Sequence, residues 1–304
     1  MSAETGLLRL TKHHGAGNDF LVYRDPDGSW PLTPALAVAL CHRRTGVGAD
    51  GLIRITAPGP AGGADLSMEL RNADGSGAEM SGNGIRCAVQ AAARAGMVAP
   101  PRIAVATGAG LKVVELVAGP PLSEASASVD MGLVHLGPEA EAPPGAKAAR
   151  TADVGNPHLV VLVDDPASVD LAAMAAWAAG PYPEGVNVEV IAATSPRGLS
   201  LRVFERGAGA TLACGTGSCA AAAVARHWGL VGDRVDVANP GGTLGVMLQI
   251  QGGGGEVVRA TLSGPVSWVA DVEVGPALVG AALRSGPEPE PVDPTRTAAT
   301  PGRS

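Results

Sequence analysis

The sequence predicts an α+β fold in which strands outnumber helices and two halves of the chain are related. Three observations support this prediction. Short β-like runs recur between turn signals, a spacing typical of antiparallel sheets or barrels rather than of βαβ units. The 304 residues include 43 glycines and 25 prolines, which disfavour long helical bundles and coiled coils. Finally, a Gly-rich segment of the first half recurs in the second half.

The predicted strands form two sets. The first set comprises residues 7–10, 20–23, 51–55, 66–70, 103–106 and 111–116. The second set comprises residues 127–131, 158–163, 187–192, 199–205, 235–238, 244–250 and 257–263. Helices are predicted over residues 33–43, 84–95, 171–179 and 217–227. Because only 3% of the residues are aromatic, we expect a core built from Ala, Val, Leu and Ile.

Proline-rich stretches indicate where the chain divides. A Pro-Pro pair marks a boundary near residue 120, which predicts an N-terminal half over residues 1–118 and a C-terminal half over residues 119–263. We expect residues 264–284 to return to the first half. The tail over residues 285–304 is Pro-rich and acidic with almost nothing to bury, which predicts disorder.

The composition argues against several classes of protein. A net charge of −7 without a cluster of Lys and Arg disfavours nucleic-acid binding, and no apolar run is long enough to span a membrane. The six histidines and four cysteines show no metal-ligand spacing, so we expect no metal. Cys87 and Cys219 are expected to be small buried side chains. Without a disulfide framework or a signal-like start, we expect a cytoplasmic protein with reduced thiols.

The recurring segment begins at Ser81 in the first half and at Cys214 in the second. Seven residues are identical at this offset, several of them glycines. Each half therefore has a Gly-rich loop that opens into an Ala-rich helix. Such a loop exposes backbone N–H groups at a helix N-terminus and predicts a cradle for a carboxylate or phosphate. The same positive field is expected to lower the pKa of Cys214 toward neutrality.

Three chemistries could use this arrangement. Residues 215–220 match the dinucleotide pattern GxGxxA, with Asp233 downstream, but residues 206–213 make a poor preceding strand. Binding of a nucleoside triphosphate is excluded because no GxxxxGK[ST] segment exists. The third chemistry is acid–base catalysis on a carboxylate-bearing substrate held between the two loops. Symmetric halves suit proton transfer at both faces of one carbon.

Eight segments in order resemble the diaminopimelate epimerase family. They are KHHGAGNDF at 12–20, RTGVGADG at 44–51, RNADG at 71–75, EMSGNGIRC at 79–87, GNPH at 155–158, VN at 186–187, ERG at 205–207 and ACGTG at 213–217. The resemblance covers Lys12 to about Val274. It implies two pseudo-symmetric β-barrel-like domains, each around a central helix, with the active site in the cleft between them. It also implies a cofactor-independent isomerase of lysine biosynthesis, commonly a homodimer, that converts LL- to meso-2,6-diaminopimelate.

The resemblance implies roles for particular residues. In the family, two cysteines flank the substrate α-carbon, and Cys214 matches the second of them. The N–H groups of four loop residues would hold the reacting α-carboxylate: Gly82, Asn83, Gly215 and Thr216. Glu205 and His158 would assist near the reacting centre. The distal end of the substrate would be bound chiefly by Asn18, Asn72, Asn156, Asn187 and Arg206, since amides both donate and accept hydrogen bonds.

The sequence departs from the family at one position that matters. Ser81 stands where the family has its first catalytic cysteine. A serine hydroxyl does not ionise near pH 7 without a strong base beside it. Three outcomes are open: an epimerase in which Ser81 relays the proton, a one-base racemase or dehydratase, or a homologue that only binds an amino acid. The other matched residues favour the epimerase.

Overall fold

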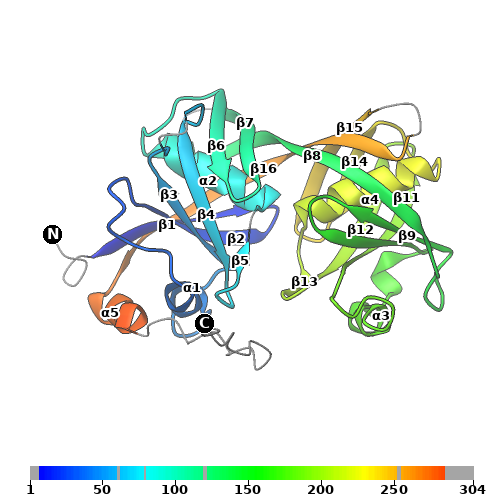
Figure 1. Ribbon diagram of the computed structural model, residues 1–304, viewed down its shortest axis with the longest axis horizontal. Coiled ribbons are helices and arrows are strands. Elements are labelled where there is room, and N and C mark those ends of the chain that lie inside the picture. Colours follow the sequence, from blue (N-terminus) through cyan, green and yellow to red (C-terminus); the bar gives the residue numbers. More distant parts are fainter. Residues whose placement is uncertain (1–6, 60–61, 79, 119–121, 252–254, 285–304) are drawn as a thin grey trace, which may run out of the picture.

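The computed structural model describes residues 7–59, 62–78, 80–118, 122–251 and 255–284. Their strands join into one continuous sheet that closes into two barrels, which lie side by side in Figure 1. Successive strands of the first barrel are β1 (Leu8–Gly15), β2 (Asn18–Arg24), β3 (Gly51–Thr56), β4 (Leu66–Asn72), β6 (Arg102–Thr107), β7 (Gly110–Ala118), β8 (Glu124–Ala140) and β16 (Val257–Val274). Pairing of β16 with β1 closes the ring, and β5 (Gly77–Ala78) pairs with β4.

The second barrel repeats this order. Its strands are β9 (Ala148–Asp153), β10 (Pro157–Leu162), β11 (Asn187–Ser195), β12 (Gly198–Glu205), β14 (Arg234–Asn239) and β15 (Gly242–Ile250), followed by β16 and β8. The parallel pairs β2–β3 and β4–β6 recur as β10–β11 and β12–β14. The short β13 (Gly209–Thr211) pairs with β12 as β5 does with β4. The predicted α+β fold of two related barrels is therefore confirmed.

Two long strands belong to both barrels. Residues 125–129 of β8 pair with β7, whereas residues 135–140 pair with β9. Residues 258–263 of β16 pair with β15, whereas residues 267–274 pair with β1. Along most of their length, β8 and β16 also pair with each other. Figure 1 shows both strands crossing from one barrel to the other.

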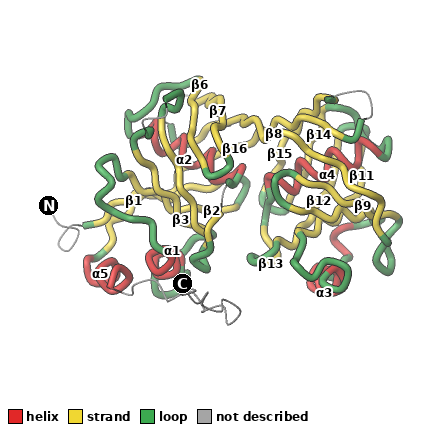
Figure 2. Tube along the Cα trace, in the orientation of Figure 1, coloured by secondary structure: helices red, strands yellow, loops and turns green. Residues whose placement is uncertain are grey.

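Each barrel encloses one helix, α2 (Gly82–Arg94) in the first and α4 (Gly215–His227) in the second (Figure 2). Nearly every residue of both helices is buried. Alanine suits this position, because its small side chain fits inside a ring of strands and loses no side-chain entropy in a helix. The Ala-rich, aromatic-poor composition thus has a structural reason.

The remaining helices lie outside the barrels. Helices α1 (Pro34–Cys41) and α5 (Pro276–Arg284) contribute to one apolar cluster beside the first barrel. Helix α3 (Leu171–Ala178) contributes to another beside the second barrel, after the short 3₁₀ turn Pro166–Ser168. The four predicted helices all occur, with ends shifted by at most two residues. Strands β5, β9 and β13 and helix α5 were not predicted.

Some predictions about the organisation of the chain are not tested. The boundary near residue 120 and the tail at 285–304 lie outside the described residues. The division at 118/119 stays a prediction, as does the return of residues 264–284 to the first domain.

Candidate active site

The N-termini of α2 and α4 are built in the same way. Ser81 caps α2, and its hydroxyl accepts a hydrogen bond from Gly84 N at 3.0 Å. Cys214 caps α4, and its Sγ accepts from Gly217 N at 3.3 Å. Both caps have extended backbone conformations, as N-cap residues do. Ser81 and Cys214 are therefore structural equivalents.

The two capped loops abut. A Cβ on Gly215 would lie 3.3 Å from Gly82 Cα and 2.9 Å from Leu262 Cδ2. A Cβ on Gly82 would lie 2.7 Å from the same leucine atom, so a larger residue at either position would have to displace Leu262. Asn83 Nδ2 also donates across the junction to the Ala213 carbonyl at 3.1 Å. Two helix N-termini, each with free N–H groups and a partial positive charge, thus face one place.

The surroundings of Cys214 overturn the expected lowering of its pKa. Burial, together with the nearby carboxyls of Glu205 and Glu189, raises the pKa of the Cys214 thiol well above its ordinary value. Hydrogen bonds from Gly217 N and with Thr216 oppose this rise but are outweighed. The positive field at the helix N-terminus favours the thiolate, but the desolvation of the thiolate on burial outweighs this effect. These surroundings favour the neutral thiol of Cys214.

Glu205 is the carboxyl beside this thiol. It ends β12, its carboxylate accepts a hydrogen bond from the Thr211 hydroxyl, and it bonds with the Cys214 side chain. Burial raises the pKa of Glu205, and those hydrogen bonds only partly offset it. The hydrogen bond between the Cys214 side chain and the Glu205 carboxyl places a proton donor beside a proton acceptor, and the pKa of each group is raised.

The other cysteines lie away from the helix mouths. Among the described residues all four cysteines are free, and Cys41, Cys87 and Cys219 are buried. Burial raises the pKa of each of these three thiols to about 12, which keeps them protonated. Cys87 and Cys219 are the small buried side chains that the sequence predicts.

Asn18 lies beside the α2 loop. It begins β2 and donates to Asp50 Oδ2 at 2.8 Å. Its Oδ1 accepts from Asn83 Nδ2 at 3.1 Å, which joins it to the junction of the two loops. Asn72 ends β4 and lies opposite Gly51 in the register of β3 and β4. Its side chain donates to Ser76 Oγ at 3.0 Å.

The corresponding residues of the second barrel form a second group. His158 Nε2 lies 2.9 Å from Asn156 Oδ1. Asn187 begins β11, donates to the Pro157 carbonyl at 2.9 Å and accepts from Arg206 N at 3.0 Å. Hydrogen bonds thus join Asn18 to the α2 loop, His158 to Asn156, and Asn187 to Arg206, whereas Asn72 bonds to Ser76 and to none of the other predicted residues described.

Three residues that contact the site were not predicted. Asp50 holds Asn18, and Glu189 lies against His158. Arg86 is fully buried and donates to Gly82 O at 2.9 Å and Asn83 Oδ1 at 2.7 Å, and burial lowers its pKa to about 10. Arg86 and Asp50 lie inside recognised motifs, so a signal existed for them.

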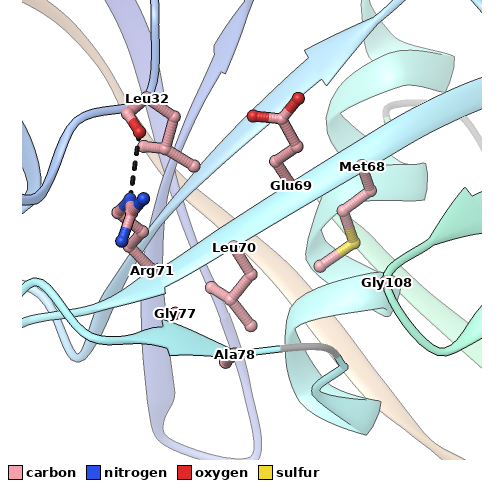
Figure 3. A pocket seen from close by; sticks show the side chains of 8 residues that line it. All are labelled: Leu32, Met68, Glu69, Leu70, Arg71, Gly77, Ala78 and Gly108. Atoms are coloured by element: carbon pink, nitrogen blue, oxygen red, sulfur yellow. Dashed lines mark hydrogen bonds between the residues drawn. The ribbon is translucent and has the colours of Figure 1, made fainter. Parts of the chain in front are cut away.

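Two cavities lie beside the barrels. One of about 400 Å³ opens beside β4, where Arg71 donates to the Leu32 carbonyl (Figure 3), and none of the predicted site residues lines it. A smaller one of about 150 Å³ lies beside α3 and includes Arg206. Within the described ranges, no cluster of His, Cys, Asp or Glu could hold a metal ion, and none of the helices is long and apolar enough to cross a membrane.

Comparison with known proteins decides the family. The diaminopimelate epimerase family model matches residues 10–136 and 150–269. The chain belongs to the diaminopimelate epimerase family. It is 39% identical over 297 residues to the diaminopimelate epimerase of Streptomyces coelicolor, covering 91% of this chain and 98% of that protein. The Thermobifida fusca enzyme is 41% identical over 281 residues, covering 88% and 98%. The predicted family and isomerase class are thereby confirmed.

Solved structures agree on the fold. A PhzF-family phenazine biosynthesis protein from Bacillus anthracis superposes with a TM-score of 0.69 at 13% identity, covering 89% of this chain and 100% of that one. A hydroxyproline epimerase from Agrobacterium vitis gives a TM-score of 0.67 at 18% identity, covering 90% and 95%. At these identities, the likeness shows the architecture of paired barrels alone.

Proposed function

We propose that this protein interconverts LL- and meso-2,6-diaminopimelate, in lysine biosynthesis, by removing and returning one α-proton without a cofactor. The observation that carries the proposal is the pair of equivalent N-caps, Ser81 and Cys214, on two helices whose first turns abut. A carbon held at this junction would meet one cap from each barrel.

The junction suits the reacting α-carboxylate. The N–H groups of Gly82 and Asn83 at α2, and of Gly215 and Thr216 at α4, precede the first intrahelical bonds and are free to donate. Both helix dipoles favour negative charge at this place, which also stabilises the carbanion-like charge that develops when the α-proton leaves.

Glu205 gives Cys214 a route to its reactive form. The neutral thiol would pass its proton to the contacting carboxyl, and the resulting thiolate would take the substrate α-proton. On the opposite face, the Ser81 hydroxyl would deliver a proton to the carbon and regain one through a water molecule. Since a serine hydroxyl is a far weaker acid than a thiol, we expect this second transfer to limit the rate.

The asparagines and one arginine would hold the distal amino-acid group. Amide groups can donate to its carboxylate and accept from its ammonium, and a guanidinium pairs with a carboxylate. We assign this role to Asn18, Asn72, Asn156, Asn187 and Arg206.

We further propose a cytoplasmic homodimer that needs no metal and binds neither nucleic acid nor membrane. The four free thiols support a reducing compartment, and the net charge of −7 opposes binding to nucleic acid. Light scattering of the purified protein measures the oligomeric state.

The test is incubation with LL- and meso-diaminopimelate, separately, in D₂O, with Cys214→Ala as the matched control. We expect deuterium at the α-carbon and inversion from both isomers, and neither with the variant. Deuterium with retained configuration would assign a one-base enzyme whose own reaction lies elsewhere. Tight binding without any exchange would leave only an amino-acid-binding homologue.

A further inference from the structure

Two neighbouring positions beside the central helix are apolar in the first barrel and polar in the second. In the parallel register, Phe20 of β2 lies opposite Gly51 of β3, just as His158 of β10 lies opposite Asn187 of β11. Phe20 is therefore the counterpart of His158. Two residues further along the second strand of each pair, Ile53 is the counterpart of Glu189.

Packing against the helices supports this equivalence. A Cβ on Gly84, in the first turn of α2, would lie 3.4 Å from Ile53 Cδ1. A Cβ on Gly217, in the first turn of α4, would lie 2.6 Å from Glu189 Oε1. Thus an apolar pair supports the helix capped by serine, whereas a polar pair supports the helix capped by cysteine.

The polar pair is completely buried. Glu189 is 0% exposed and His158 is 1% exposed. Glu189 Oε1 lies 2.7 Å from His158 Nδ1, and no partner for Oε2 occurs among the described residues. A buried carboxylate is unfavourable unless it is paired, so this glutamate depends on the histidine for its countercharge.

The contacts of His158 define where its hydrogens lie. Nε2 faces Asn156 Oδ1 at 2.9 Å, and an amide oxygen only accepts, so Nε2 carries a hydrogen. Nδ1 faces the Glu189 carboxylate, which also only accepts. Both contacts are hydrogen bonds at once when both ring nitrogens donate, which is the arrangement of an imidazolium paired with a carboxylate.

We propose that Glu189 is a positioning residue that keeps His158 as the imidazolium, which in turn fixes the Asn156 amide with its NH₂ group free to donate to a substrate carboxylate. This inference rests on the proposed function for the identity of the substrate. A neutral ring hydrogen-bonded only through Nδ1–H would instead present a lone pair at Nε2. Asn156 would then turn its NH₂ group to the ring and its oxygen to the substrate.

Glu189→Gln tests the proposal, because it removes the charge and keeps the shape. We expect the KM for diaminopimelate to rise by about 10- to 100-fold, the range for a lost hydrogen bond to a charged group, with kcat within about twofold. Glu256→Gln, an exposed carboxylate, is the matched control and leaves KM unchanged.

A second measurement needs neither substrate nor activity. In ¹⁵N-histidine spectra at pH 7, His158 of the unaltered protein should show both nitrogens protonated, and in Glu189→Gln it should show one. The signal is assigned by its loss in His158→Phe. If the unaltered protein shows neither exchange nor inversion of diaminopimelate, the proposed function fails while these spectra still decide the state of the pair.

The double variant His158→Phe with Glu189→Ile copies the first barrel and guards against misfolding of the single variant. It should fold, lose the ¹⁵N signal and share the raised KM. A neutral His158 in the unaltered protein, or an unchanged KM in Glu189→Gln or the double variant, would overturn the proposal.

Discussion

His13 makes the stability of the first barrel dependent on pH. It lies on β1, is 0% exposed, and its ring nitrogens lie 2.7 Å from Gln90 Oε1 of α2 and 2.8 Å from Thr11 Oγ1. Burial lowers its pKa from 6.5 to about 4. Between pH 6.5 and pH 4, His13 is protonated in the unfolded chain but neutral in the folded chain. The free energy of unfolding therefore falls as the pH falls.

The size of the effect follows from the shift. A change of about 2.5 pKa units corresponds to about 3 kcal/mol, which is present above pH 6.5 and lost by pH 4. Urea unfolding at intervals from pH 4 to pH 8 measures it against His13→Gln, which keeps a polar side chain that does not titrate. We expect the variant to lose this part of the pH dependence. Exposed His135→Gln is the control, and a slope in His13→Gln equal to that of the unaltered protein would refute the reasoning.

Two further predictions concern the junction of the loops. Ser81→Cys supplies a second thiol, and we expect inversion to rise about 100-fold, with an oxidant then joining that thiol to Cys214. An unchanged rate of inversion would show that the hydroxyl does not limit the reaction. Gly215→Ala sets a Cβ 2.9 Å from Leu262 and should lower kcat/KM about 100-fold by separating the loops. Gly59→Ala, which meets nothing within 4 Å, is its control, and equal activity in the two variants would contradict the packing argument.

The sequence predicts the repeated parts of this fold well. The glycines and caps around Ser81 and Cys214 recur because both helices must begin at the same kind of crowded junction. Local signals of this sort, a cap followed by glycines and an alanine run, are visible in one sequence. The relation between the two halves follows from them without any knowledge of strand pairing.

The sequence predicts β8 and β16 too short, and the reason is physical. Gly132 and Pro138 interrupt the pattern of β8, and Gly264 and Pro265 interrupt β16. In isolation, these residues indicate turns. In the barrels, Gly132 takes a positive φ of 92° near an irregularity in the β8–β16 register, so the strand bends and continues.

The chemistry of the site depends on burial, which the sequence does not display. A cysteine at a helix N-terminus suggests a low pKa, yet the opposite shift holds because the thiol is enclosed beside two carboxyls. Glu189 is equally hidden, as one charged residue in a strand of apolar neighbours whose partner is 31 residues upstream. Neither environment can be inferred before the barrels close.

Strand β16, which belongs to both barrels, also determines the order in which a growing chain can complete them. Residues 267–274, which cover the edge of β1, leave the ribosome after every strand of the second barrel. Until then the first barrel has an open edge, a template for pairing with other chains. Contacts between residues 8–14 and 267–274 also give the molecule pairings of very long sequence separation, a feature of slow folding. The second barrel is built from one contiguous stretch of chain, whereas the first barrel cannot close until that stretch has been made.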